Sequence, residues 1–460
     1  MRTDYDVILI GAGPAGIFAA LELSARHPEL RVAILERGAD INRRRCPISG
    51  TGRSCLRCKP CSIVYGWGGA GAFSDGKLTL TTEFGGILDQ YIDQEELAKL
   101  ISEVDRVYLD FGAPDTVFGT NAATRDLQRQ AATADLHFIP ATIRHMGTET
   151  CYRVLEGMRQ HLEGRVEVHT ESPVARIEER DGAVTGVTLE SGQALTASYV
   201  VAAPGRGGAE WFAREGARLD LGLENNPVDI GVRVEVPAVV MAHLTDAVYE
   251  SKFLYYTRAF DDMVRTFCMN PYGEVVVENT DGLKIVNGHS YAERKTENTN
   301  FALLVSKTFT EPFREPISYG KYIASLANML GDGVIVQRLG DLRAGRRTTD
   351  RRLQKGGVRP TLVDATPGDL SLVLPYRHLI DILEMLEALD RIAPGINSRY
   401  TLLYGVEVKF YSSRPQLSRV LETRISNLFA AGDGAGVTRG LAQASAAGVL
   451  VAREILRRTN

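Results

Sequence analysis

The first 36 residues contain the feature that most constrains the fold of this chain. The apolar run "YDVILI" leads into the glycine-rich turn "GAGPAG", then a helix of small residues, then a second apolar run that ends at Glu36. This order is typical of a β-α-β unit. Gly11 permits the tight turn, Gly13 lets the backbone approach a pyrophosphate, and Gly16 lets the helix pack closely on the strand.

Glu36 completes the pattern, because it follows Gly16 by twenty positions. An acidic side chain there accepts hydrogen bonds from the hydroxyls of an adenosine ribose and repels a 2′-phosphate. The N-terminus of the helix adds the positive end of a dipole for the pyrophosphate. The segment therefore predicts an unphosphorylated dinucleotide, bound by Gly11, Gly13, Pro14, Ala15, Gly16, Glu36 and Arg37.

The other end of the chain carries a second motif, "NLFAAGDGAGVTRGLAQASAAGVLVAREILRR", from residue 427. It reads as a short strand, a Gly-Asp pair, a glycine loop and a helix of small residues, and it resembles the C-terminal flavin motif of the glutathione-reductase-like FAD superfamily. The resemblance implies that Asp433 holds the ribitol chain, and Gly432 beside it is a further predicted cofactor-binding residue. It also implies that a helix beginning near Gly440 and Leu441 points at the flavin N1/O2 edge, where a reduced flavin carries negative charge.

The segment "TESPVARIEERDGAVTGVTLESGQALTASYVVAAPGRGG" lies between these motifs and alternates apolar and polar residues around Asp-Gly and Ser-Gly turns. It reads as the small β-meander of such flavoproteins. The resemblance places Val174 at the adenine, and Ala203 and Gly205 beside the nucleotide. The three ordered motifs predict FAD rather than NAD, and NAD(P)H binding transiently would leave no motif of its own.

The stretch "GWGGAGAFSDGK" has closely spaced glycines, which suit a loop whose backbone amides face phosphate or flavin. Its predicted cofactor-binding residues are Gly68, Gly69, Ala70, Gly71, Ser74 and Asp75. The stretch closely resembles a group of poorly characterised FAD-dependent dehydrogenases. Further matching pieces are "RTFCMNPYGEVV" (265–276), "VNGHSY" (286–291) and "GVEVKFYSSRP" (405–415).

Four of the six cysteines, Cys46, Cys55, Cys58 and Cys61, come just before this stretch. Three interpretations stay open. All four could ligate zinc or an iron–sulfur cluster, since Cys55, Cys58 and Cys61 have ferredoxin-like spacing. Cys58 and Cys61 could form a redox pair that exchanges electrons with the flavin. The thiols could also simply shape the loop, because spacing alone does not separate these fates.

The pattern changes to successive strands from about residue 226 to 345, which we assign to a cap domain on the substrate side of the flavin. The sequence thus predicts an α/β fold: a FAD-binding Rossmann-like domain of the glutathione-reductase type, with a small β-meander and an inserted mixed α+β cap. We expect the FAD domain at 1–85, 145–225 and 400–460, and the cap at 86–144 and 226–399. Candidate catalytic residues are Cys58, Cys61, Cys268 and His289, and other polar candidates in the cap are Tyr255, Tyr256, Arg265 and Tyr291.

The bulk properties favour small-molecule partners. A net charge of −4 and a pI near 6.1 provide no general attraction to nucleic acid or an acidic membrane. No apolar run approaches the length of a membrane span, and the start "MRTDYD" shows no signal-peptide pattern, so we expect a cytoplasmic protein. The oligomeric state leaves no readable signal.

These observations predict an FAD-dependent oxidoreductase that transfers hydride between flavin N5 and a small organic substrate. One alternative is an iron–sulfur/flavin electron-transfer protein that uses the four cysteines. Another is a flavin monooxygenase, although "VVAAPGRGGAEWF" lacks the Asp-Gly motif expected of that class.

Overall fold

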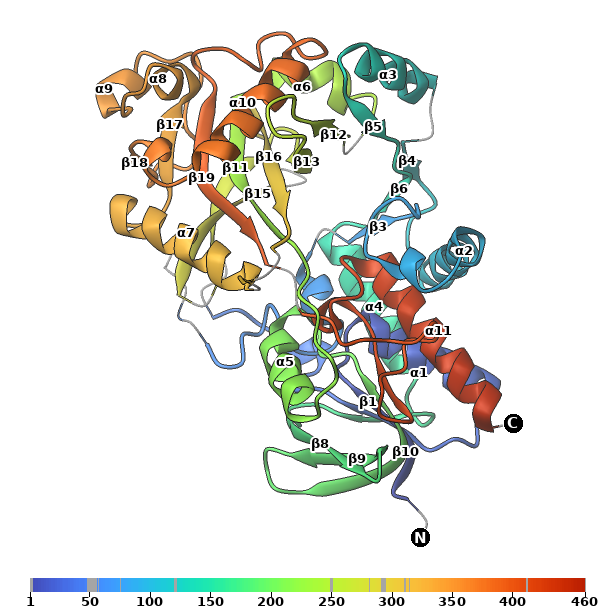
Figure 1. Ribbon diagram of the computed structural model, residues 1–460. Helices are drawn as coiled ribbons and strands as arrows, with labels where there is room; N and C mark the ends of the chain where they lie inside the picture. Colours follow the sequence, from blue (N-terminus) through green and yellow to red (C-terminus); the bar gives the residue numbers. More distant parts are fainter. Residues whose placement is uncertain are drawn as a thin grey trace. The chain divides into compact units, whose positions relative to one another are not determined.

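The chain divides into two compact units in the computed structural model (Figure 1). Unit 1 comprises Met1–Val117, Ile143–Asn226 and Ser412–Asn460, and unit 2 comprises Phe118–Thr142 and Pro227–Tyr411. The residues described are 3–47, 56, 58–74, 76–119, 122–248, 251–280, 282–290, 295–309, 312–313, 315–410 and 413–459. Within these ranges, no helix has both the length and the apolar character needed to cross a bilayer.

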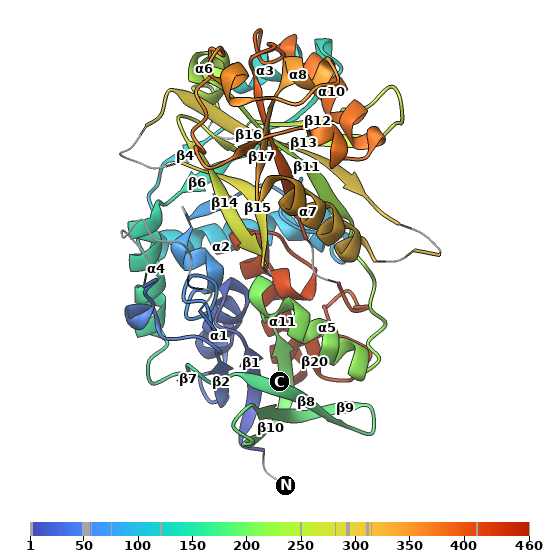
Figure 2. The same ribbon diagram turned by 90° about the vertical axis from the view of Figure 1, so that its left-hand side faces the viewer.

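Unit 1 is built on a sheet in the order β7-β2-β1-β10-β9-β8, in which β20 also pairs with β10. The strands β7, β2, β1, β10 and β20 pair in parallel, and β8, β9 and β10 form an antiparallel meander, which lies at the bottom of Figure 2. Their bounds are β1 (Tyr5–Ile10), β2 (Val32–Leu35), β7 (Glu167–His169), β8 (Val174–Arg180), β9 (Ala183–Leu189), β10 (Ala194–Ala202) and β20 (Leu428–Ala430).

Two helices of unit 1 pack closely because small residues lie at their contact. The first helix, α1, lies against the last helix, α11, so the two ends of the chain are neighbours. A Cβ built on Gly448 of α11 would lie 2.1 Å from the carbonyl oxygen of Ala15 in α1, a distance that only glycine allows. The bounds are α1 (Pro14–Arg26), α2 (Gln94–Asp110), α4 (Thr148–His161), α5 (Ala209–Arg218) and α11 (Leu441–Thr459), with short 3-10 helices η1 (Ile41–Arg43), η2 (Gly69–Phe73), η3 (Leu88–Gln90), η4 (Arg206–Gly208) and η6 (Asp433–Ala435), and a small sheet of β3 (Lys77–Thr79), β6 (Ile143–His145) and β4 (Val117–Phe118).

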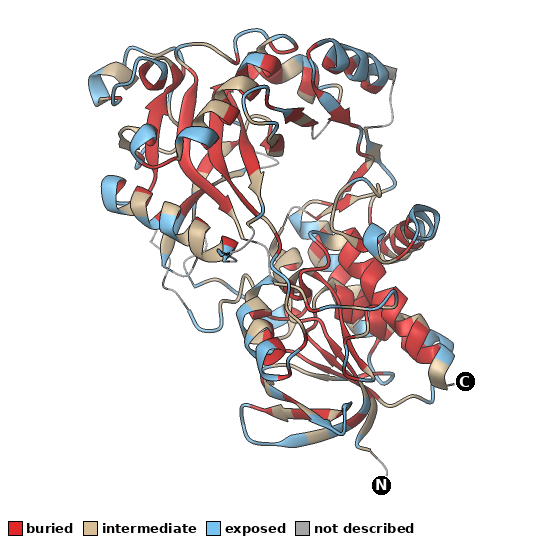
Figure 3. Cartoon of the chain, viewed as in Figure 1, coloured by how far each residue is buried: buried red, intermediate tan, exposed pale blue. Residues whose placement is uncertain are grey.

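Unit 2 contains an eight-stranded sheet in the order β18-β17-β19-β11-β16-β13-β12-β5. Its middle strands are buried along almost their whole length, as Figure 3 shows. The bounds are β5 (His137–Ile139), β11 (Val228–Pro237), β12 (Lys252–Tyr256), β13 (Met263–Asn270), β16 (Asn298–Lys307), β17 (Ile335–Arg338), β18 (Thr366–Pro367) and β19 (Leu402–Lys409), and a separate hairpin joins β14 (Glu274–Thr280) and β15 (Leu283–His289).

The two faces of this sheet differ in chemistry because side chains alternate along each strand. In β11, one face carries Val228, Ile230, Val232, Val234 and Val236, which pack into the main core of unit 2. Four helices supply the other half of this core, namely α3 (Ala122–Thr133), α6 (Ala238–Thr245), α7 (Pro316–Gly331) and α10 (Tyr376–Asp390). The short helices α8 (Leu339–Arg343), α9 (Asp350–Leu353) and η5 (Leu370–Leu372) complete the unit.

The second face of β11 buries three charged side chains, and each has a partner. Arg233 donates two hydrogen bonds to Glu407, at 2.7 and 2.8 Å, and both side chains are fully buried. Asp229 accepts from Arg265, and Glu235 accepts from the Tyr404 hydroxyl. Burial alone would raise the pKa of Glu407, but the attraction of neighbouring cations outweighs it and lowers the pKa.

The structure divides the chain differently from the sequence prediction at two places. Residues 86–117 belong to unit 1 rather than to a cap, because α2 buries its apolar stripe in the core of unit 1 and contacts α11. Residues 400–411 belong to unit 2 rather than to the FAD domain, because β19 pairs with β11 and β17.

We predict that Arg233→Met lowers the free energy of unfolding by about 3–5 kcal/mol, because it removes the two hydrogen bonds of Arg233 to the buried Glu407 carboxylate and leaves that carboxylate with Lys409, at 3.1 Å. Arg424→Met is the matched control: Arg424 pairs with Asp220, but the side chains are 54% and 80% exposed. We expect the control to change stability by less than about 1 kcal/mol. Chemical denaturation measures both, and equal losses would contradict the assignment.

Candidate functional site

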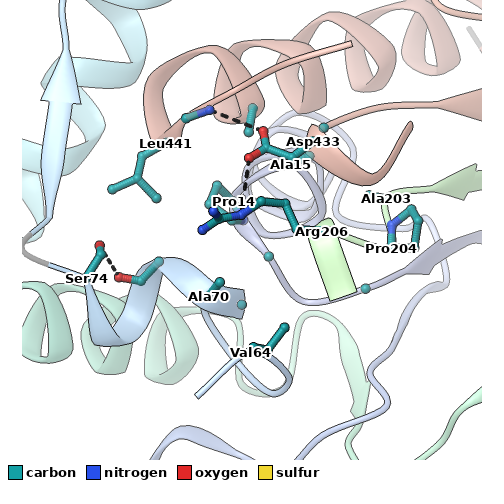
Figure 4. Close-up of a pocket in the computed structure, with 18 of the residues that line it drawn as sticks. Pro14, Ala15, Val64, Ala70, Ser74, Ala203, Pro204, Arg206, Asp433 and Leu441 are labelled. Atoms are coloured by element: carbon teal, nitrogen blue, oxygen red, sulfur yellow. Dashed lines mark hydrogen bonds and ion pairs between the residues drawn. The ribbon is translucent and has the colours of Figure 1, made fainter. Parts of the chain in front are cut away.

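A cavity of about 240 Å³ lies in unit 1, beyond the carboxyl ends of β1, β10 and β20 (Figure 4). Its wall consists of the turn after β1, the segment around η2, the turn after β10, and the loop that leads from β20 into α11. Both ends of the chain therefore contribute to one site. The predicted cofactor residues that line it are Gly11, Gly13, Pro14, Ala15, Glu36, Gly69, Ala70, Gly71, Ser74, Ala203, Gly205, Gly432, Asp433, Gly440 and Leu441.

Four predicted cofactor residues are not part of this wall, namely Gly16, Arg37, Gly68 and Val174. A fifth, Asp75, lies outside the described residues. Gly16 serves packing, because a Cβ at this position would lie 2.0 Å from the carbonyl oxygen of Gly11. The Gly68 amide donates to the carbonyl oxygen of Ala12 at 2.8 Å, so it ties the η2 segment to the first turn.

Glu36 directly follows β2 and has a buried carboxylate that accepts three backbone amides. Oε2 accepts from the Ala12 amide, and Oε1 accepts from the amides of Gly38 and Gly66, each at 2.8 Å. A carboxylate offers about four lone-pair positions, two on each oxygen. One position on Oε2 therefore stays available to a donor in the cavity, such as a ribose hydroxyl.

Asp433 is the other carboxylate of the wall, placed there by the turn after β20. Its Oδ1 accepts from the Thr438 hydroxyl at 2.7 Å and from the Gly440 amide at 3.2 Å. Arg206 Nε lies 4.0 Å from Oδ2, beyond hydrogen-bond distance (Figure 4). Burial raises the pKa of Asp433, against the opposing attraction of Arg206 and the hydrogen bond from Thr438.

Two helices present their N-termini to this cavity. Pro14 begins α1 and Leu441 begins the 19-residue α11, and both residues line the wall. The N-cap of α1 is Gly13, which has no side chain to cap the first-turn amides. Unpaired amides and the positive end of the helix dipole both favour negative groups such as phosphate.

Sequence reasoning missed several wall residues: Val64, Tyr65, Lys77, Pro204, Arg206 and Ala444. Arg206 lies inside the quoted stretch "APGRGG", so its position could have been inferred from that motif. Tyr65 had no such signal. Its hydroxyl donates to the carbonyl oxygen of Gly207 at 2.5 Å, a contact between segments distant in sequence.

The cysteine segment does not form a ligand set among the described residues. Cys46 and Cys61 are half-buried and Cys58 is exposed, all as free thiols, while Cys55 lies outside the described residues. Where side chains are described, no three His, Cys, Asp or Glu residues form a group that could hold a metal ion. The structure therefore offers no support for the zinc or iron–sulfur interpretation, and Cys58 and Cys61 are not joined by a disulfide.

The four predicted catalytic residues are not brought together in the cavity. Cys58, Cys61, Cys268 and His289 are all absent from its described wall. Cys268 lies in β13 with a left-handed φ of 46°, at an irregularity in the pairing of β13 with β16. His289 ends β15 and is exposed, and Tyr291 lies outside the described residues.

Comparison with known proteins adds a family match. Residues 227–410 match a family described as "FAD-dependent protein, C-terminal domain-like". An uncharacterized protein of Clostridium beijerinckii is 27% identical over 477 residues, which cover 98% of this chain and 80% of that protein. The family match agrees with the flavin dependence that the sequence motifs predict.

Solved flavoprotein structures also align along the chain, at low identity. Pyridoxine 4-oxidase from Mesorbium loti is 13% identical with a TM-score of 0.43, and the alignment covers 98% of this chain and 99% of that one. Glycine oxidase from Geobacillus kaustophilus is 15% identical with a TM-score of 0.40, covering 99% and 95%.

Substitutions at Gly13 and Gly11, both in the first turn, should affect ligand binding and folding differently. A Cβ on Gly13 meets nothing within 4 Å, and its φ of −81° suits any residue. We predict that Gly13→Val folds with a nearly unchanged melting temperature but loses FAD, because the side chain enters the cavity. Gly11→Val should instead lower the melting temperature, because Gly11 has a φ of 106° and its Cβ would lie 2.2 Å from the Ala203 carbonyl oxygen. Calorimetry and FAD titration measure the two effects, and full FAD binding by Gly13→Val would contradict this assignment.

Proposed function

We propose that this protein is an FAD-dependent oxidoreductase, of the glutathione-reductase-like superfamily, that transfers hydride between flavin N5 and a small organic substrate. The observation that carries the proposal is the single cavity to which the Gly11–Ala15 turn, Glu36, Asp433 and the start of α11 all contribute. The family match over 227–410 supports the same cofactor.

The residues of the cavity suit the successive parts of FAD. The free acceptor position of Glu36 would take an adenosine ribose hydroxyl. The first-turn amides of α1 would hold the pyrophosphate, since no side chain caps them. Oδ2 of Asp433 has no hydrogen bond from the described residues of the wall, and it would accept from the ribitol hydroxyls.

The bound FAD supplies the hydride donor or acceptor, and the protein supplies orientation and electrostatics. The N-terminus of α11 would stabilise negative charge on the cofactor edge next to Gly440 and Leu441. Apolar side chains such as Val64 and Leu441 line the wall, and with the cofactor bound they would exclude water and so strengthen these electrostatic contacts. The cysteines are not part of the proposal, because those that are described form no ligand set.

A spectrum of the purified protein tests the cofactor. We expect an absorption band of the flavin at about 450 nm that bleaches on reduction. We also expect about one FAD bound per chain at saturation. The family match and the cavity both require this result. A protein that takes up no FAD on titration would remove the proposed function.

Arg206 offers a sharper test, because its side chain is 69% exposed and its Nε lies 4.0 Å from Asp433. Such a pair contributes little to stability, so the guanidinium can turn to a phosphate. We predict that Arg206→Ala raises the FAD Kd roughly fivefold, about 1 kcal/mol, and reduces its dependence on salt. Arg26→Ala is the control, since the Arg26 side chain is 58% exposed and pairs with Glu22, one helical turn away. An FAD Kd that is unchanged in Arg206→Ala would contradict this role.

A further inference from the structure

Arg44 stands out among the basic residues around the cysteine segment because it is buried. Only 4% of its surface is exposed, whereas the side chain of its neighbour Arg43 is 56% exposed and pairs with Glu171. An isolated buried guanidinium is costly, so it needs a dense set of acceptors. The acceptors of Arg44 show what the residue does.

Arg44 donates four hydrogen bonds to backbone carbonyls of one loop. Nε donates to Ser62 O at 2.9 Å, and one terminal nitrogen donates to Ile63 O at 3.0 Å. The other terminal nitrogen donates to Trp67 O at 2.6 Å and to Gly69 O at 2.8 Å. One planar group therefore fixes eight consecutive residues, from Ser62 to Gly69.

The amides of the same loop are bound on its opposite side. The Gly66 amide donates to Glu36, and the Gly68 amide donates to Ala12 O. The carbonyls of the loop thus accept hydrogen bonds from the buried Arg44 guanidinium. Two of its amides donate to the Glu36 carboxylate and to the turn after β1. Burial lowers the pKa of Arg44 to about 10, with Glu36 acting in the opposite direction, so the guanidinium stays charged at neutral pH.

This loop continues directly into the wall of the cavity. Gly69, Ala70 and Gly71 line the cavity, and Arg44 does not. The Arg44 guanidinium also lies over the ring of Phe73, 4.8 Å from its centre, at the end of η2. Glycine and alanine have too little side chain to hold this part of the wall in place. Its position therefore depends on contacts of residues outside the cavity, such as Arg44, with its backbone and with Phe73.

We propose that Arg44 is a positioning residue for the cofactor: its guanidinium holds the Ser62–Gly69 carbonyls so that η2 stands where FAD needs it. This inference rests on the proposed function. Lysine cannot replace arginine here, because an ammonium is a compact point charge without the planar fork that reaches four spread carbonyls.

The test compares Arg44→Lys and Arg44→Ala with Arg43→Lys and Arg43→Ala in the full chain. Flavin fluorescence gives the FAD Kd, and thermal unfolding of the apoprotein is recorded in parallel. We expect Arg44→Lys to raise the Kd at least about tenfold, which is about 1.4 kcal/mol. Both Arg43 variants should stay within about twofold of wild type, because Arg43 makes its ion pair at the surface.

Chemical rescue distinguishes positioning from general damage. Millimolar methylguanidine should enter the space left in Arg44→Ala and restore much of the FAD affinity, which a nonspecifically loosened protein would not show. If Arg44→Ala does not fold, Arg44→Lys alone decides the question, since it keeps the charge.

Two results would overturn the inference: an unchanged FAD Kd in Arg44→Lys, or an affinity defect in folded Arg44→Ala that methylguanidine leaves as it was. Absence of FAD binding by the wild-type protein would overturn the proposed function and this inference with it. The wild-type titration therefore tells the two failures apart.

Discussion

The carboxylate of Glu36 accepts three backbone amides, and the cavity of unit 1 depends on this interaction. It joins the turn after β1, through Ala12, and the loop before η2, through Gly66, to its own segment, in which it accepts from Gly38, at 2.8 Å each. Arg44 complements it from the other side by taking carbonyls of the same loop. Glycine-rich segments have exposed peptide groups and few side chains to pack, so buried charges with many hydrogen bonds perform the task that apolar side chains perform elsewhere.

Close backbone contact then brings the two ends of the chain together. A Cβ on Gly434 would lie 2.1 Å from the carbonyl oxygen of Gly205, and one on Gly448 would lie equally close to Ala15 O. These approaches interlock the turns after β1, β10 and β20, which arrive side by side because their strands pair in parallel. Small residues in the terminal motifs are thus a requirement of the packing as well as of a ligand.

The local motifs of the sequence predict most of the cavity wall, because a strand, a glycine turn and a helix have a fixed geometry at short range. What the sequence could not indicate is the partner of each segment. Tyr65 enters the wall through a hydrogen bond to Gly207, far away in the chain, and nothing local predicts it. The apolar stripe of α2 could pack in either domain, and β19 could join either sheet. The sequence therefore did not indicate that residues 86–117 belong to unit 1 and residues 400–411 to unit 2. The basic segment around Arg44 shows the same limit, since charge alone does not reveal which arginine is buried.

The Arg233 guanidinium contacts three stretches that the sequence analysis singled out, residues 265–276, 286–291 and 405–415. It donates to the carbonyl of Cys268 in the first stretch and to Asn287 in the second, and it forms the buried ion pair with Glu407 in the third. Gly288 lies so close that a Cβ there would be 2.2 Å from the guanidinium. A buried cation that is bound from several strands fixes the identity of its neighbours, because any unmatched partner leaves a charge or a donor unsatisfied. The packing of this guanidinium therefore constrains Asn287, Gly288 and Glu407. It does not by itself make Cys268 or His289 a reacting group, and chemistry at unit 2 has to be argued from side chains outside this cluster.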